Sequence, residues 1–84
     1  MRSVRTQQFR KLLEGLPEQV QRQVETAYGQ FKRDPWYPGL HFKEVAPSIH
    51  SVRIGLHHRA LGTKTDDTII WYWIGTHAEY DKLV

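Results

Sequence analysis

The sequence contains no cysteine, which excludes disulfide bonds and thiolate metal sites as the means of holding this 84-residue chain together. A domain of this size has a small core, so its fold depends on how well its own side chains pack. No apolar run approaches the roughly 20 residues that a membrane span needs, and residues 1–11 lack the apolar segment of a secretory signal. We therefore expect one domain over residues 1–84, located in the cytoplasm and not bound to a membrane.

Patterned metal ligands and cofactor motifs are also missing. The sequence has no glycine-rich phosphate loop, no readable Ser-His-Asp arrangement and no spaced set of His, Asp and Glu. His57 and His58 are adjacent, and neighbours in a regular strand point to opposite faces, so they do not chelate one ion. We expect neither a metal nor a cofactor.

The composition favours a binding surface for an anionic partner without requiring one. Lysine and arginine number 12 against 9 acidic residues, and the formal net charge is +3. This excess is compatible with nucleic acid. Three tryptophans in so short a chain indicate a packed core, a binding face, or both.

The first third of the sequence has the apolar spacing of two helices. From Phe9 to Leu16 the apolar residues recur at i, i+3, i+4 and i+7, and Thr6 is suited to cap this helix. Pro17 suits the first turn of a second helix, whose apolar residues continue at helical spacing to Phe31. The stretch "DPWYPG" ends it. These two segments predict an antiparallel helical hairpin.

From Leu40 onward the apolar period changes to two, which is typical of strands. The stretches "LHFKEV", "SVRIGL" and "HHRALGTK" alternate, and "TIIWYWI" (Thr68–Ile74) is apolar on both faces, as in a central strand. Residues 2–5 are a candidate for one more short strand. We predict an α+β fold, in which the helical hairpin packs on one face of a three- or four-stranded antiparallel sheet and a short C-terminal helix follows.

Three basic residues on three strands share one face in this arrangement. If Val52 points toward the helices, Arg53 and Lys43 point away from them, and Arg59 joins them when the small Ala60 faces the helices. Such a cluster could hold phosphate groups. The alternative is that these are solvated residues on an ordinary outer face.

Aromatic side chains of the last strand extend this candidate site. One of two alternating sets must share the face of the cations, namely Ile69, Trp71 and Trp73 or Ile70, Tyr72 and Ile74. Flat rings beside cations could stack nucleobases, so Trp71 and Trp73 are candidate substrate contacts, with His58 as a further candidate. The alternative is that the rings only pack in the core.

The stretch "THAEY" predicts a helix start next to this face. Thr76 and Glu79 have the spacing of a capping box, and the helix then begins at His77 with Tyr80 on the same side. An imidazole near a basic groove could donate or accept a proton in phosphodiester cleavage. The alternative is that His77 is a surface residue at a helix start.

Four stretches in order along the chain resemble the RelE/ParE superfamily of toxins from bacterial type II toxin–antitoxin systems. They are "FRKLLEGLPEQVQ", "FKRDPWYPGLHFKEV", "SVRIGLHHRALG" and "IIWYWIGTHAEYDKL". The most specific features are Arg-Ile-Gly with a second arginine six residues after the first, and Ile-Gly-x-His-x-x-Tyr at the end of the last strand.

The resemblance implies two helices against an antiparallel sheet, a cognate antitoxin and a toxin–antitoxin hetero-oligomer. RelE-like members act on the ribosome as endoribonucleases and cut mRNA without a metal, by attack of the substrate's own 2′-hydroxyl. By position, Arg53 and Arg59 match residues that hold the scissile phosphate, and Lys43 matches a basic strand position. His77 matches a catalytic histidine of several members. Tyr80 matches an aromatic hydroxyl, with a role in orienting substrate, stacking or proton transfer.

One departure from the family pattern and one related activity leave other functions open. Some RelE-like nucleases carry a further arginine near the end of the last strand, and "IGTHAEY" has none. ParE-like relatives share the scaffold but inhibit DNA gyrase by protein binding, without nuclease activity. A non-toxic RNA- or protein-binding module is a third interpretation, because a shared fold does not fix an activity.

Overall fold

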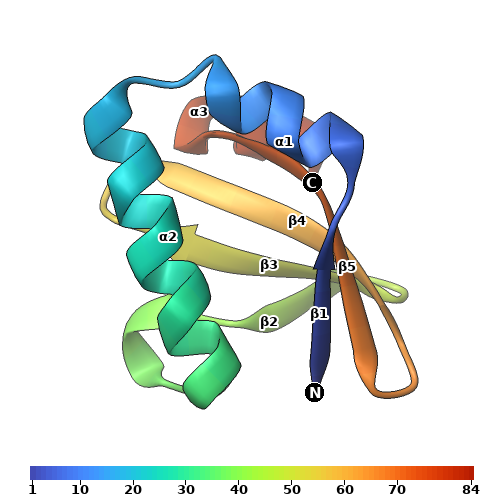
Figure 1. The fold of residues 1–84 in the computed structure, drawn as a ribbon. Helices are drawn as coiled ribbons and strands as arrows, with labels where there is room; N and C mark the ends of the chain where they lie inside the picture. The colour runs from blue at the N-terminus through green and yellow to red at the C-terminus, as the bar shows by residue number, and fades with distance from the viewer.

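Helices and strands account for most of the chain, and the computed structural model describes all of residues 1–84. In chain order the elements are β1 (Arg2–Arg5), α1 (Gln7–Glu14), α2 (Glu18–Arg33), the 3-10 turn η1 (Pro38–Leu40), β2 (Lys43–Ala46), β3 (Ile49–Ile54), β4 (His58–Thr65), β5 (Thr68–Thr76) and α3 (His77–Leu83). The strands form one sheet in the order β1-β5-β4-β3-β2 (Figure 1). None of the helices combines the length and apolar composition needed to cross a membrane.

The predicted α+β fold is confirmed, with five strands in place of the expected three or four. β1 pairs in parallel with β5, whereas the other neighbouring strands are antiparallel. The stretch from Ile69 to Trp71 is apolar and needs a neighbouring strand along both edges to satisfy its backbone groups. Residues 2–5 supply the second neighbour, and Ile69 is completely buried.

Helices α1 and α2 cover one face of the sheet. The Thr6 hydroxyl accepts a hydrogen bond from the Phe9 N–H at 3.1 Å, which caps α1 as predicted. Pro17 lies just before the first turn of α2, and Asp34 ends that helix. The two helices diverge from the turn between them, so the hairpin is an open one (Figure 1).

The core lies between these two helices and the sheet. Its centre is Phe31 of α2, whose ring centroid lies 5.0 Å from that of Phe42 and 5.3 Å from that of Trp71, both edge-on. Edge-to-face packing of this kind is favourable beyond simple area burial. The buried residues of this cluster are Phe9, Leu13, Val24, Phe31, Leu40, Phe42, Val52, Ile54, Ala60, Ile69, Trp71 and Ile74.

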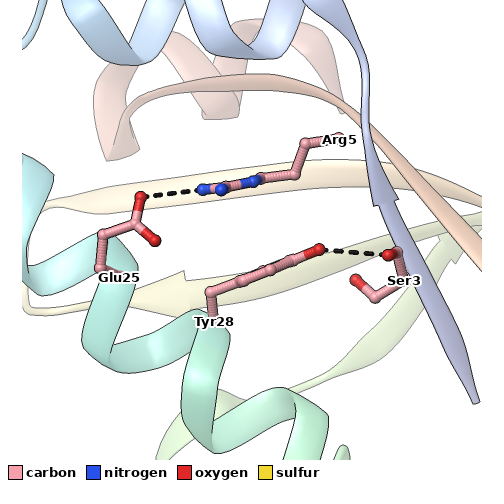
Figure 2. A network of polar contacts seen from close by, with 4 residues as sticks. All are labelled: Ser3, Arg5, Glu25 and Tyr28. Carbon is pink, nitrogen blue, oxygen red and sulfur yellow. Dashed lines mark hydrogen bonds and ion pairs between the residues drawn. The ribbon is translucent and has the colours of Figure 1, made fainter.

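Side chains of β1 and α2 hold the N-terminal strand in place. Figure 2 shows the Arg5 guanidinium 2.9 Å from the Glu25 carboxylate and the Tyr28 hydroxyl donating to the Ser3 carbonyl oxygen at 3.2 Å. The Arg5 guanidinium also lies over the Tyr28 ring, 4.4 Å from its centroid. This network connects the first strand to the middle of α2, across 20 and 25 residues of sequence.

Helix α3 lies on the face of the sheet opposite α1 and α2 (Figure 1). Its Tyr80 is only 7% exposed, and the Tyr80 hydroxyl donates to the Ser51 Oγ of β3 at 3.3 Å. Ser51 and Leu61 are buried although they point away from the core helices. The second face of the sheet is therefore partly covered by α3.

Candidate functional site

The side chains of the three basic residues predicted to share a face all leave the backbone on the same side of the sheet. Arg53 and Arg59 are direct partners in the ladder between β3 and β4, and Lys43 of β2 is the partner of Ser51. The intervening Val52 and Ala60 are buried against the helices. Because side chains alternate along a strand, all three cations leave the sheet on the side where α3 lies.

The side chain of Arg53 turns to the edge of the sheet. β2 pairs with β3 only as far as Ser51, so no strand covers β3 beside Arg53. The Arg53 Nε donates to the Gly55 carbonyl oxygen at 3.0 Å, and its Nη1 lies 3.4 Å from Nε2 of His41. Arg53 therefore borders a groove beside α2, and only Arg59 stays next to α3.

Arg59 is held against the aromatic ring of α3. Its guanidinium carbon lies 5.8 Å from the centroid of the Tyr80 ring. The burial of Tyr80 and the hydrogen bond from its hydroxyl to Ser51 exclude base stacking by this ring in the present conformation. The stacking role predicted for Tyr80 is thus corrected. The Tyr80 ring instead packs against the Arg59 guanidinium.

His77 is the first residue of α3, and the predicted capping box is present before it. The Glu79 N–H donates to the Thr76 Oγ at 3.1 Å, and the Thr76 N–H donates to the Glu79 carboxylate at 2.8 Å. The Thr76 backbone and hydroxyl donors lower the pKa of Glu79. The cap fixes where the helix starts, and thereby the direction of the His77 side chain.

Asp81 is the site residue that the sequence interpretation missed. Its Oδ1 lies 3.2 Å from Nε2 of His77, one turn along α3, and both side chains are about half exposed. The spacing i, i+4 on a helix is the signal that could have identified this pair. The carboxylate holds one ring nitrogen of His77 and leaves Nδ1 for a ligand.

His58 lies at the end of β4 on the side of the core helices, because its strand partners are Ile54 and Thr76. Burial lowers the pKa of His58, the neighbouring His57 lowers it further, and Glu79 opposes the shift. His58 faces the capping box rather than Arg59. The structure brings no three of its His, Asp and Glu side chains together in a way that could hold a metal ion.

Trp71 and Trp73 point to opposite faces of β5, contrary to the prediction that they share one. The pairing of β4 with β5 shifts between Leu61, the partner of Trp73, and Gly62, the partner of Trp71. This bulge puts one extra residue in β5 and inverts the alternation after it. Trp71 is 2% exposed in the core, where its Nε1 donates to the Ser3 Oγ, so its predicted substrate contact is wrong.

Trp73 lies on the same side of the sheet as α3 and is partly exposed. Its ring covers Gly75, since a Cβ at residue 75 would lie 2.5 Å from the ring. Gly75 is the strand partner of Arg59. The indole of Trp73 and the guanidinium of Arg59 therefore belong to neighbouring positions on one surface.

The order of the strands, the helices on both faces of the sheet and the cations on its second face agree with the toxin scaffold that the sequence motifs indicate. The family model described as the ParE-like toxin domain matches residues 18–82. The chain therefore belongs to the ParE-like toxin domain family, within the RelE/ParE superfamily. No curated protein matches it at the level of sequence.

Solved structures share this fold. One is a RelB-RelE antitoxin–toxin complex from Methanococcus jannaschii, with a TM-score of 0.75, 16% identity, and coverage of 96% of this chain and 99% of that one. Another is the toxin–antitoxin complex RelBE2 from Mycobacterium tuberculosis, with a TM-score of 0.66, 25% identity and coverage of 92% and 91%. A copper-bound mutant toxin from Helicobacter pylori has a TM-score of 0.58, 21% identity and coverage of 94% and 97%.

Proposed function

We propose that this toxin is a ribosome-dependent mRNA endoribonuclease that acts in the cytoplasm. The observation that supports the proposal is that Arg59 and His77 both lie beside one buried ring, that of Tyr80. The Tyr80 centroid lies 5.8 Å from the Arg59 guanidinium carbon and 6.0 Å from the His77 centroid. A phosphate held by Arg59 is then close to an imidazole able to move a proton.

The reaction requires a base that removes the proton of the 2′-hydroxyl, an acid that protonates the leaving oxygen, and a group that stabilises charge on the phosphate. The chain offers one candidate for the proton transfers and two for the stabilisation. The 2′-hydroxyl of the substrate attacks the adjacent phosphorus, the bond to the 5′-oxygen breaks, and the leaving oxygen takes up a proton. His77 is the candidate acid or base, oriented by Asp81. Arg59 and Arg53 are the candidates for stabilising the charge that develops on the phosphate. The nucleophile belongs to the substrate, so this mechanism uses no metal.

Lys43 and Trp73 are secondary candidates on the same surface. Lys43 is exposed on β2, where it could contact a phosphate away from the reacting bond. Trp73 is the ring left for base stacking once Trp71 is assigned to the core.

The proposed partners are an antitoxin, mRNA and the ribosome. The structures from M. jannaschii and M. tuberculosis contain a toxin with its antitoxin. By analogy, an antitoxin would bind this chain in a hetero-oligomer and mask its basic face. Acidic segments in such a partner would complement the net charge of +3.

Inhibition of DNA gyrase is the second candidate function. The match of residues 18–82 to the ParE-like toxin domain favours it, as does the absence of a further arginine between Gly75 and Tyr80. A gyrase inhibitor acts by protein binding and needs no residue that transfers a proton.

One experiment separates the two functions. The chain is induced alone in bacteria, growth is followed, and the 5′ ends of translated mRNAs are mapped for the wild type and for His77→Ala. The matched control is His57→Ala, which removes an exposed imidazole but leaves the bond from the His77 N–H to the His57 carbonyl oxygen. Cleavage within codons that disappears only in His77→Ala supports the nuclease. Arrest with intact mRNA and inhibited supercoiling in all three proteins supports gyrase inhibition.

A further inference from the structure

A polar groove runs between α2 and the segment that contains η1. It has a volume of about 520 Å³, which is within the usual range for ligand sites. Its lining residues come from α2, from the segment around η1 and from the end of β3. The groove meets the candidate site at Arg53, where β3 is no longer paired with β2.

The wall formed by α2 is a stripe of uncharged polar side chains. Gln19, Gln23, Thr26 and Gln30 recur at i, i+4, i+7 and i+11, which is one face of a helix. Each of these side chains carries both a donor and an acceptor. The Gln23 side chain reaches the turn after β3, since a Cβ at Gly55 would lie 2.9 Å from its Oε1. The stripe thus extends to the turn that accepts the Arg53 hydrogen bond.

The opposite side of the groove carries an exposed ring. Tyr37 is 47% exposed, in a segment with a proline on each side of "WY". Gly39 lies against this ring, because a Cβ there would be 3.0 Å from the Tyr37 Cε2. The backbone of Gly39 therefore supports the Tyr37 ring on one side, and no side chain at residue 39 covers the ring.

Charge in the groove has one sign. Arg53 and Arg22 are its only charged lining residues, and no carboxylate lines it. Arg22 is paired with Glu18, whereas Arg53 has only a carbonyl oxygen and a histidine nitrogen as neighbours. The free positive charge is therefore at Arg53, between the amide stripe and the ring.

We propose that this groove binds single-stranded RNA through Arg53, as a continuation of the strand whose reacting phosphate Arg59 holds. This inference rests on the proposed function for the identity of the polymer. A cation for a phosphate, amides for base edges and a supported ring for stacking are the groups that single-stranded nucleic acid requires. An acidic or apolar peptide would leave most of the amide stripe unused.

The test measures affinity for a probe that cannot be cleaved. A fluorescein-labelled hexamer of 2′-O-methyl RNA lacks the nucleophilic hydroxyl, and its binding to the purified full-length chain is followed by anisotropy. Tyr37→Ala is expected to weaken binding about tenfold, whereas Tyr37→Phe keeps the ring and changes affinity less than about twofold. Gln19→Ala weakens binding about threefold, and the matched control Gln7→Ala, an exposed glutamine on α1, has no effect.

Chemical-shift mapping with the same hexamer locates the contact in the wild-type protein without any variant. Shifts of backbone amides between Gln19 and Gln30 support the groove. Equal affinity of wild type and Tyr37→Ala, or shifts confined to residues near Arg59 and His77, overturns the proposal. Loss of affinity for a partner protein but not for RNA in Tyr37→Ala also overturns it and makes the groove a protein-docking surface.

The outcome is separable from that of the proposed function. If mRNA is not cleaved in cells but the hexamer binds through Tyr37, the nuclease proposal fails and the groove remains an RNA site. If mRNA is cleaved through His77 but Tyr37→Ala binds RNA as the wild type does, only the groove proposal fails.

Discussion

The Asp81 carboxylate lies 3.2 Å from Nε2 of His77, one helical turn further along α3. The pair is exposed to solvent, so its contribution to stability is small. Its consequence is chemical, because the carboxylate fixes the orientation of the imidazole ring.

Asp81→Asn should reduce mRNA cleavage about tenfold, because the amide holds the His77 ring less firmly. The measurement is the amount of cleaved mRNA in ribosome-containing extracts. Glu14→Gln, at the exposed end of α1, is the control and should cleave as the wild type does. Cleavage by Asp81→Asn at the level of the wild type would show that the pair has no part in catalysis.

His50 is a buried imidazole whose Nδ1 has no hydrogen-bond partner. Burial lowers the pKa of His50, and Lys64 lowers it further against the opposing charge of Glu44. The unfolded chain, with a histidine pKa near 6.5, then binds more protons than the folded one. Stability should therefore fall as the pH drops from about 6.5 toward the lower pKa of the folded state.

The measurement for His50 is urea unfolding at pH 7.5 and 5.0. His50→Leu should lose less of its free energy of unfolding between pH 7.5 and 5.0 than the wild type does. Substitution of the exposed His57 by alanine should leave that loss unchanged. The pKa of His58 is lowered as well. The dependence of the free energy of unfolding on pH should therefore be weaker in His50→Leu but still present. A slope equal to that of the wild type would contradict the prediction.

Part of this structure was predictable from the sequence and part was not. Apolar periodicity identified both helices and four strands, and the spacing of Thr76 and Glu79 identified the start of α3. Alternation also put Arg53 and Arg59 on one face. Such patterns are local, and a single sequence carries them directly.

The features that sequence reasoning missed depend on tertiary contacts. The bulge opposite Leu61 and Gly62 separates Trp71 from Trp73, and a one-residue shift of pairing leaves no local pattern. The path of the Arg53 side chain depends on where β2 stops pairing with β3. The burial of Tyr80 requires α3 to pack on the sheet, and a seven-residue helix has too few positions to show which face is covered.

Tyr28 tests how β1 is attached to the rest of the fold. Its hydroxyl donates to the Ser3 carbonyl oxygen (Figure 2), and the Arg5 and Lys32 cations both lie over its ring. Tyr28→Phe should cost about 1 kcal/mol, because one hydrogen bond is lost while both cation–ring contacts remain. Tyr28→Ala should cost more.

The measurement for Tyr28 is urea unfolding together with amide hydrogen exchange of residues 2–5. Exchange in β1 should accelerate in Tyr28→Phe, whereas exchange in β3 should follow global stability alone. Tyr37→Phe, which removes an exposed hydroxyl, is the control. Uniform acceleration over the whole sheet would contradict a local attachment of β1.

Gly62 has no side chain, and this absence lets the Trp71 ring enter the core. A Cβ at this position would lie 2.8 Å from Cε3 of Trp71 and 3.0 Å from Ile69. These neighbours are almost completely buried and cannot move aside freely. Gly62→Ala should therefore lower the free energy of unfolding by about 1–3 kcal/mol, measured by urea titration. Gly29→Ala is the control, since a Cβ there meets only the end of the Arg33 side chain at 3.8 Å, and in the middle of α2 it should stabilise the chain. If Gly62→Ala were as stable as the wild type, the bulge would have to relax to make room, and Trp71 fluorescence would then shift toward that of a more exposed indole.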